Sequence, residues 1–370
     1  MCTGCTDTFY CSKKCRKRNP HCSNHTLRNI RQSLLANKAS KHPQPCKKKG
    51  RKNTKENSQK RDEADCIESA MSILHVTENV ASSVSISTEE LCFECAPIPG
   101  KGIGIIATRD IGYGELILQE QPVLNDTLDE SLESQFNKLS CTDQEKVMRL
   151  YNAHPGCKEL EGIIKSNRFS TDEVNSGSVM CIEASRFNHS CLPNVLHRYS
   201  KPFERVFAIR DIKKGEELCT SYIQSDIMMK TTRERRKFLF IVWRFECMCE
   251  LCDTNDKAWQ QQIELYRGRY QAIDAEIENP FLNLKERMAL VREIFEVMEK
   301  GKMICPPLIS MHAGDGFQLA VACKDRRKAV KYAKLGYEAS LIANGDYSLE
   351  TQSLLKRIKN PFERLVQAET

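Results

Sequence analysis

Two kinds of hydrophobic pattern divide this chain. Short apolar runs separated by glycine turns, such as "LCFECAPI" and "IGIIA", predict β-strands between residues 91 and 118. Residues 129–170 favour helices, and residues 177–222 return to short apolar runs that predict further strands. From residue 257 onward, apolar residues recur at helical spacing. The pattern therefore predicts an α+β domain followed by a helical one.

The helical part contains two apolar stripes. One occupies a single helix face and is closed by Gly301; its members are Val291, Ile294, Phe295 and Met298. The other repeats every four residues, which suits close antiparallel packing; its members are Ala329, Ala333, Tyr337 and Leu341. We expect helical hairpins like those of tetratricopeptide-type proteins, without a fixed-period repeat.

Composition sets the N-terminal part aside. Residues 1–30 are dense in Cys and His. Residues 31–88 are too polar to bury a core, so we interpret residues 31–88 as a basic flexible linker. The expected domains beyond the linker are residues 89–224 with a helical insert at about 125–175, a cysteine-containing segment at 225–253, and a helical C-terminal domain at 254–370.

Charge follows the same division. The chain has a net charge of +7, and the N-terminal arm, residues 1–61, carries 17 Lys and Arg residues against Asp7 and Glu56. The rest of the chain is therefore acidic. The arm is expected to contact nucleic acid or another acidic surface. Its "KKKGRK" run, residues 47–52, fits either a nuclear localisation signal or a solvated charge run.

Nothing in the pattern predicts a membrane or secretory protein. No apolar run approaches the ~18 residues that span a bilayer, and "MCTGCTDTFYCSKKC" lacks an apolar signal core. We therefore interpret the 19 cysteines as reduced thiols and metal ligands rather than as a disulfide framework.

The segment "FECMCELCD" contains the strongest chemical signal. Cys247, Cys249 and Cys252 can bind zinc, but a structural zinc site requires four ligands. Cys191, in "NHSCLPN", is the natural fourth. A hydrolase pair of His189 and Cys191 is disfavoured, because such pairs usually meet from distant positions in the chain.

Two further motifs are weak when taken alone. Gly102 and Gly104 in "PGKGIGIIATRDI" fit a dinucleotide loop loosely, but β-branched residues and another glycine turn follow instead of a helix. We expect a turn between strands that brings backbone close to a small molecule. Tyr222 ends "GEELCTSY", and a tyrosine at a strand end is usually half-buried packing.

In this order, "GKGIG", "NHSCLPN", "GEELCTSY" and "FECMCELC" resemble the SET-domain lysine methyltransferases, most closely the small fungal-type members of the SET- and MYND-domain group. The resemblance covers roughly residues 90–252. It implies a SET-domain β-fold with a pseudo-knot, a zinc-bound post-SET loop, and the cofactors S-adenosyl-L-methionine and zinc. It also implies methyl transfer to lysine side chains of a protein substrate, histone or non-histone.

The resemblance assigns residues. Tyr222 matches the catalytic tyrosine, and we assign it the alignment of the lysine amine. The implied cofactor-binding residues are Lys101, Gly102, Ile103, Asn188, His189, Tyr222 and Phe245. The pseudo-knot implies that Cys191 completes the zinc site of Cys247, Cys249 and Cys252. For Asn167, contact with the cofactor and use as a core or cap residue stay open.

The N-terminal cysteines resemble the second half of a MYND zinc finger. Cys2, Cys5, Cys11 and Cys15 either form one partial zinc site or belong to a degenerate finger. Cys92 and Cys95 should point to opposite faces of a strand and so chelate poorly. We expect four other cysteines to be small buried hydrophobes: Cys141, Cys157, Cys181 and Cys219.

Alternative functions follow from the same features. A non-catalytic SET-like module that binds chromatin or peptides is the main rival, although a catalytically dead copy has no need of Tyr222. Nucleic-acid binding through residues 1–61 is compatible with either function. The expected location is the nucleus, the cytoplasm or both.

Overall fold

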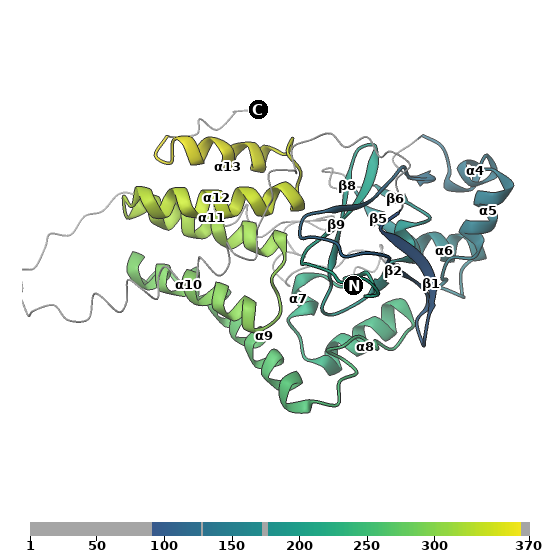
Figure 1. The fold of residues 1–370 in the computed structure, drawn as a ribbon, viewed down its shortest axis with the longest axis horizontal. Helices are drawn as coiled ribbons and strands as arrows, with labels where there is room; N and C mark the ends of the chain where they lie inside the picture. The colour runs from purple at the N-terminus through teal and green to yellow at the C-terminus, as the bar shows by residue number, and fades with distance from the viewer. Residues whose placement is uncertain (1–90, 127–128, 172–176, 364–370) are drawn as a thin grey trace, which may run out of the picture. The chain divides into compact units, whose positions relative to one another are not determined.

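The computed structural model describes residues 91–126, 129–171 and 177–363 (Figure 1). The predictions for residues 1–30 and 31–88, including a zinc site at Cys2, Cys5, Cys11 and Cys15, lie outside this part. The α+β class is confirmed. The strands of the described part are β1 (Phe93–Ile98), β2 (Gly102–Ala107), β3 (Leu116–Glu120), β4 (Leu124–Asn125), β5 (Arg168–Ser170), β6 (Ser178–Met180), β7 (Asn188–His189), β8 (Val195–Ser200), β9 (Phe203–Ala208) and β10 (Cys219–Thr220).

These strands form small sheets rather than one large one. β1 pairs antiparallel with β2, while β9 lies between β3 and β8. β6 lies between β4 and β5, and β7 pairs in parallel with β10. A buried core joins the first two sheets; Ile105 of β2 and Val206 of β9 are among its fully buried members. This core places the β1–β2 hairpin, and with it the glycine turn, at a fixed position.

The expected helical insert contains three short helices: α4 (Leu132–Asn137), α5 (Cys141–Met148) and α6 (Glu159–Asn167). Serine side chains cap the first two, because Ser131 and Ser140 accept hydrogen bonds from the backbone of the first turn. Two further short helices are η2 (Ala184–Arg186), a 3₁₀ helix between β6 and β7, and α7 (Ser225–Met228), which follows β10.

Two predicted strands are much shorter in the structure than in the sequence pattern. Only residues 178–180 of "SGSVMCIEA" and 219–220 of "EELCTSYI" form strands. The pattern overestimates them because these segments are buried on several sides. Apolar residues there do not report sheet pairing alone.

The C-terminal part is helical, from α8 (Thr232–Trp243) onward (Figure 1). The helices that follow are α9 (Lys257–Ile277), α10 (Leu284–Lys300), α11 (Pro306–Ala322), α12 (Arg326–Ala343) and α13 (Leu349–Lys359). The predicted stripe of α10 is buried, and this helix ends at Gly301 as expected. In the described part, no helix is long and apolar enough to cross a membrane.

The predicted stripe of α12 is only partly correct. Ala329 and Ala333 are buried, but Tyr337 and Leu341 are half-buried. A step of four residues exceeds the 3.6-residue turn, so a strict four-residue repeat rotates away from the core. Tyr332 takes the central place and packs directly over Gly316 of α11, where a Cβ would lie 2.5 Å from its ring.

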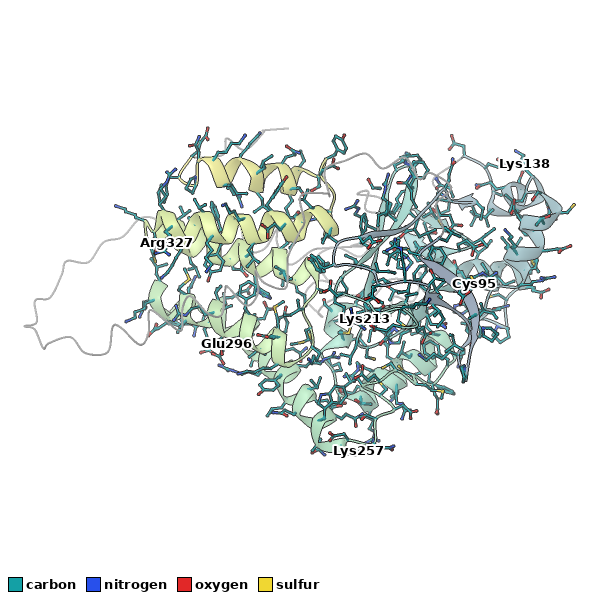
Figure 2. All side chains as sticks on the ribbon, in the orientation of Figure 1. Cys95, Lys138, Lys213, Lys257, Glu296 and Arg327 are labelled. Atoms are coloured by element: carbon teal, nitrogen blue, oxygen red, sulfur yellow. The ribbon has the colours of Figure 1, made fainter. Side chains whose placement is uncertain are left out.

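The predictions for the remaining cysteines divide. Cys181 and Cys219 are buried as expected, but the prediction is wrong for Cys141, which is exposed, and for Cys157, which is half-buried. Cys141 is the first residue of α5, and Cys157 lies in the loop before α6, so neither is enclosed by the core of the insert. As expected, Cys92 and Cys95 cannot chelate together. Cys92 is buried, whereas Cys95 is exposed on β1 (Figure 2) and bonds to Glu183.

Candidate active site and zinc centre

The glycine turn between β1 and β2 brings the backbone close to Asn188. Gly100 and Gly102 have φ of +74° and +80°, the left-handed region that favours glycine. At Gly104, a Cβ would lie 2.7 Å from Nδ2 of Asn188 and 2.7 Å from Ile98. The absence of a side chain at Gly104 therefore lets the Asn188 amide lie against the hairpin.

Glu217 joins the turn to the Asn188 loop. Its carboxylate accepts hydrogen bonds from Lys101 Nζ at 2.6 Å and from Asn188 Nδ2 at 3.0 Å. Burial acts to lower the pKa of Lys101, but the bond to Glu217 outweighs it, so the pKa is raised and the lysine stays charged. Sequence reasoning missed Glu217. Its sequence signal was its place in the "GEELCTSY" motif, in which no role was assigned to this glutamate.

The chain crossing at β7 and β10 is held by backbone and asparagine hydrogen bonds. Asn188 and His189 lie opposite Cys219 and Thr220 in parallel register. Asn194 closes the loop, because its side chain donates to the Glu217 carbonyl at 2.9 Å and accepts from Cys219 N at 2.7 Å. These bonds fix the direction in which "NHSC" leaves the strand.

Tyr222 lies in an aromatic group with three other rings. Its ring centroid is 5.2 Å from that of Trp243, 5.5 Å from that of His189 and 6.2 Å from that of Phe245. Its hydroxyl donates to the Phe187 carbonyl at 2.8 Å. Trp243 was not predicted, since a tryptophan at a helix end carries no distinctive sequence signal. The buried Nε1 of Trp243 has no hydrogen-bond partner among the described residues.

Burial sets the protonation of the site. It raises the pKa of Tyr222, so the phenol is neutral at pH 7. It lowers the pKa of His189 to about 4, so the imidazole is neutral as well. His189 Nδ1 accepts from Tyr222 N at 3.0 Å, which assigns the ring proton to Nε2, 3.4 Å from Cys191 Sγ.

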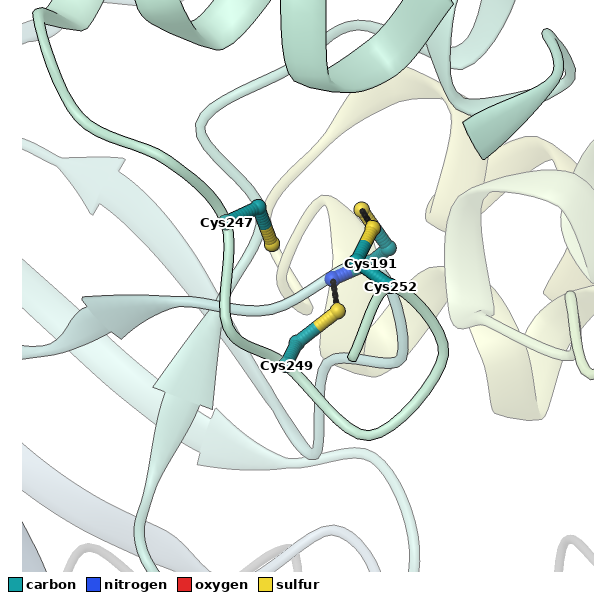
Figure 3. A group of neighbouring side chains, drawn as sticks. All are labelled: Cys191, Cys247, Cys249 and Cys252. Carbon is teal, nitrogen blue, oxygen red and sulfur yellow. Dashed lines mark hydrogen bonds between the residues drawn. The ribbon is translucent and has the colours of Figure 1, made fainter. Parts of the chain in front are cut away.

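Four buried cysteines belong to the same packed cluster as Tyr222, Trp243 and Phe245. The sulfur atoms of these cysteines, Cys191, Cys247, Cys249 and Cys252, all lie within 4.8 Å of one another (Figure 3). Cys191 N donates to Cys249 Sγ at 3.4 Å, and hydrogen bonds from the other three cysteines lower the pKa of Cys249. Four converging thiols, one already favouring the thiolate, fit the ligand set of a structural zinc ion.

The segment between these cysteines also reaches the glycine turn. A Cβ at Gly100 would lie 2.8 Å from Sδ of Met248, so Met248 packs on the turn. The Ile103 carbonyl accepts from Asn188 Nδ2 at 3.4 Å. Glycine turn, Asn188 loop and post-SET segment thus converge, and the orphaned Trp243 N–H lies within the same region. This arrangement fits a small polar molecule such as S-adenosylmethionine.

Asn167 takes the second of its two expected roles. Its Nδ2 donates to the carbonyls of Tyr151 and Ile163 at 2.8 and 2.7 Å. It is the last residue of α6 and is buried. The amide is therefore engaged in capping this helix.

The fold and site place the chain in a known class. The family model of the SET domain matches residues 102–223 of this chain. Histone-lysine N-methyltransferase set5 of Schizosaccharomyces pombe is 30% identical over 73% of this chain and 84% of its own length. On that match, the chain belongs to the family of SET-domain lysine methyltransferases.

Other relatives are similar over shorter stretches. A putative SET domain-containing protein, L678, of Acanthamoeba polyphaga mimivirus is 29% identical over 45% of this chain and 80% of its own length. N-lysine methyltransferase SMYD2 of Homo sapiens is 28% identical over 35% of this chain and 31% of its own length.

Proposed function

We propose that this protein transfers methyl groups from S-adenosylmethionine to lysine side chains of protein substrates, at a site centred on Tyr222. The observation that carries the proposal is the position of the Tyr222 hydroxyl. It is fixed on the Phe187 carbonyl at 2.8 Å, within the aromatic group and next to Asn188 and His189. A non-catalytic binding module does not need a tyrosine hydroxyl fixed in this way.

S-adenosylmethionine would be held by the backbone of Lys101, Gly102 and Ile103, by the loop of Asn188 and His189, and by the ring of Phe245. When bound, it supplies a methyl group on a positively charged sulfur. The exposed Ile103 side chain and Met248, which packs on Gly100, supply apolar surface beside these polar groups. Cys191, Cys247, Cys249 and Cys252 would hold the zinc ion, which cross-links the two chain segments.

The reaction requires a neutral lysine amine, whose ordinary pKa is ~10.4. The rings of Trp243 and Phe245 around Tyr222 disfavour the charged ammonium by desolvation. Because the pKa of Tyr222 is raised, its neutral hydroxyl is a poor general base at pH 7. Its oxygen instead orients the amine, and the Phe187 carbonyl supplies a second fixed oxygen.

Histones are the substrate class that we propose first. The relative from Schizosaccharomyces pombe is named a histone-lysine methyltransferase, and the human relative an N-lysine methyltransferase. Residues 62–370 are acidic, which favours association with basic, lysine-rich tails. Action on histones places the protein in the nucleus at least part of the time, and the basic arm, residues 1–61, would contact the acidic nucleosome surface there.

The test is transfer of radiolabelled methyl onto core histones and onto the proteins of a cell lysate, with Tyr222→Phe beside the wild-type protein. We expect Tyr222→Phe to lower kcat by about 100-fold or more, since it removes one fixed oxygen, while S-adenosylmethionine affinity stays near wild type. Tyr347→Phe, on the surface at 90% exposure, is the matched control. Unchanged turnover in Tyr222→Phe would remove Tyr222 from the mechanism, and histone binding without any transfer would favour the binding module.

A further inference from the structure

Two arginines next to the four cysteines are completely buried. Arg235 lies on α8 and Arg267 on α9, and both side chains have 0% exposure. Arginine is almost never fully buried in proteins unless an anionic partner compensates its charge. The surroundings of these two residues therefore need a source of negative charge.

The partners of both guanidinium groups are neutral or sulfur atoms. Arg267 donates to the carbonyls of Cys191 and Met228, each at 2.9 Å, and of Gly301 at 3.2 Å. Arg235 donates to the Lys230 carbonyl, to Thr232 Oγ1 at 2.9 Å and to Cys252 Sγ at 3.9 Å. Within residues 91–126, 129–171 and 177–363, neither forms an ion pair with a carboxylate, and Nε of Arg235 lacks a partner.

The cysteine cluster is the source of negative charge that adjoins both guanidinium groups. Arg235 lies 3.9 Å from Cys252 Sγ, and Arg267 donates to the carbonyl of Cys191 at 2.9 Å. Arginine keeps its charge at neutral pH, because its ordinary pKa is ~12.5 or higher.

Two other cations near the cluster have carboxylate partners. Lys101 pairs with Glu217 at 2.6 Å, and Arg236 is 3.8 Å from Asp253. Zinc bound by four thiolates carries two net negative charges, and burying them without compensation is unfavourable. The two positive charges of Arg235 and Arg267 equal these two negative charges in number.

We propose that Arg235 and Arg267 compensate the charge of the zinc-bound thiolates, and that Arg267 thereby makes α9 part of the zinc centre. The proposal rests on the proposed zinc site. It extends that site beyond the SET and post-SET segments into the C-terminal helices. Loss of zinc leaves two buried like charges side by side, so zinc binding and the docking of α9 are thermodynamically linked.

The experiment measures zinc affinity of the full chain by competition with a chelator. Arg267→Met and Arg235→Met keep side-chain length but remove the charge, and should weaken zinc binding by about 10- to 100-fold. Arg269→Met is the matched control, because Arg269 lies on the same α9 but is exposed and pairs with Glu293. Wild-type zinc affinity in both buried-site variants would overturn the proposal.

Thermal unfolding distinguishes charge compensation from a purely structural role, in which Arg267 only donates hydrogen bonds to carbonyl groups. Charge compensation requires that Arg267→Met lower the unfolding midpoint more in zinc-loaded than in zinc-free protein. An equal shift in both states contradicts it. If the variant does not fold, hydrogen exchange of the wild type decides, since chelation should accelerate exchange in α9, and unchanged exchange there overturns the linkage. A wild-type protein that binds no zinc at all would instead overturn the zinc site itself.

Discussion

Gly104 is the residue at which a single added methyl group meets the site most directly. Alanine there would place its Cβ 2.7 Å from the Asn188 amide and from Ile98. Overpacking of this kind costs ~1–3 kcal/mol. We expect Gly104→Ala to weaken S-adenosylmethionine binding by about tenfold, measured by titration calorimetry.

Gly112→Ala is the matched control for this substitution. A Cβ at Gly112 meets nothing within 4 Å. Its cofactor affinity should equal that of the wild type. Normal affinity in Gly104→Ala would show that the position of Asn188 against the hairpin does not matter for the cofactor.

His189 makes stability depend on pH. Its pKa is about 4 in the folded protein, whereas an unfolded histidine titrates near ~6.5. The unfolded chain binds the extra proton first, so this contribution to stability is complete above pH ~6.5 and is lost as the pH falls toward 4. The free energy of unfolding, measured with denaturant, should fall between about pH 7.5 and about pH 5.5 in the wild type. This fall should be ~1 kcal/mol larger in the wild type than in His189→Gln. Equal pH dependence in both proteins would contradict the buried neutral imidazole.

At the scale of elements, the post-SET segment connects the cysteine cluster to the glycine turn and to Tyr222. Met248 lies between Cys247 and Cys249 and packs on the glycine turn, while Phe245 packs edge-on against Tyr222. Metal binding in structural zinc sites contributes ~10 kcal/mol or more of folding free energy in model peptides. That is far above the cost of ordering this short segment.

Cys249→Ser should therefore lose zinc and also bind S-adenosylmethionine severely less tightly, although Cys249 lies in the metal cluster. Cys191→Ser should do the same from the other side of the chain crossing. Cys92→Ser and Cys95→Ser are the controls, since neither lies in the cluster. Titration calorimetry with metal analysis tests the coupling. A zinc-free Cys249→Ser protein with normal cofactor affinity would disprove it.

At the scale of the whole molecule, the catalytic unit should be independent of the N-terminal arm. The contacts that build the site join residues 98–301, including the bond from Arg267 to Gly301. Arg198 of β8 further ties the SET domain to the C-terminal helices, because it donates to the carbonyls of Leu341 and Ile342. Removing residues 1–85 takes away none of these partners.

We expect the protein without residues 1–85 to be folded and to bind S-adenosylmethionine like the full chain, measured by thermal unfolding and calorimetry. We expect the full chain to bind DNA in a salt-dependent way and the truncated protein to lose most of that dependence. An insoluble truncated protein, or one without cofactor affinity, would place the domain boundary elsewhere.

The sequence alone was sufficient for the class of fold, the family and the group of cysteines. Metal-ligand spacing, glycine turns and helical periodicity are local properties, so Cys247, Cys249, Cys252 and the stripe of α10 could be identified without coordinates. Motif order added Cys191 and Tyr222, because the family resemblance supplies the long-range pairing that spacing cannot.

Only the tertiary structure showed that Glu217 contacts Asn188, that Trp243 contacts Tyr222, and that Arg235 and Arg267 contact the cysteine cluster. A charged residue is usually at the surface and a tryptophan usually fills a core. The sequence neighbours of such residues do not show which distant backbone carbonyl or thiol they meet. Likewise, Asn167 resolved into a helix cap only when the carbonyls of Tyr151 and Ile163 were brought beside it. Burial and charge compensation depend on contacts between segments far apart in the chain, and these exist only once the chain has folded.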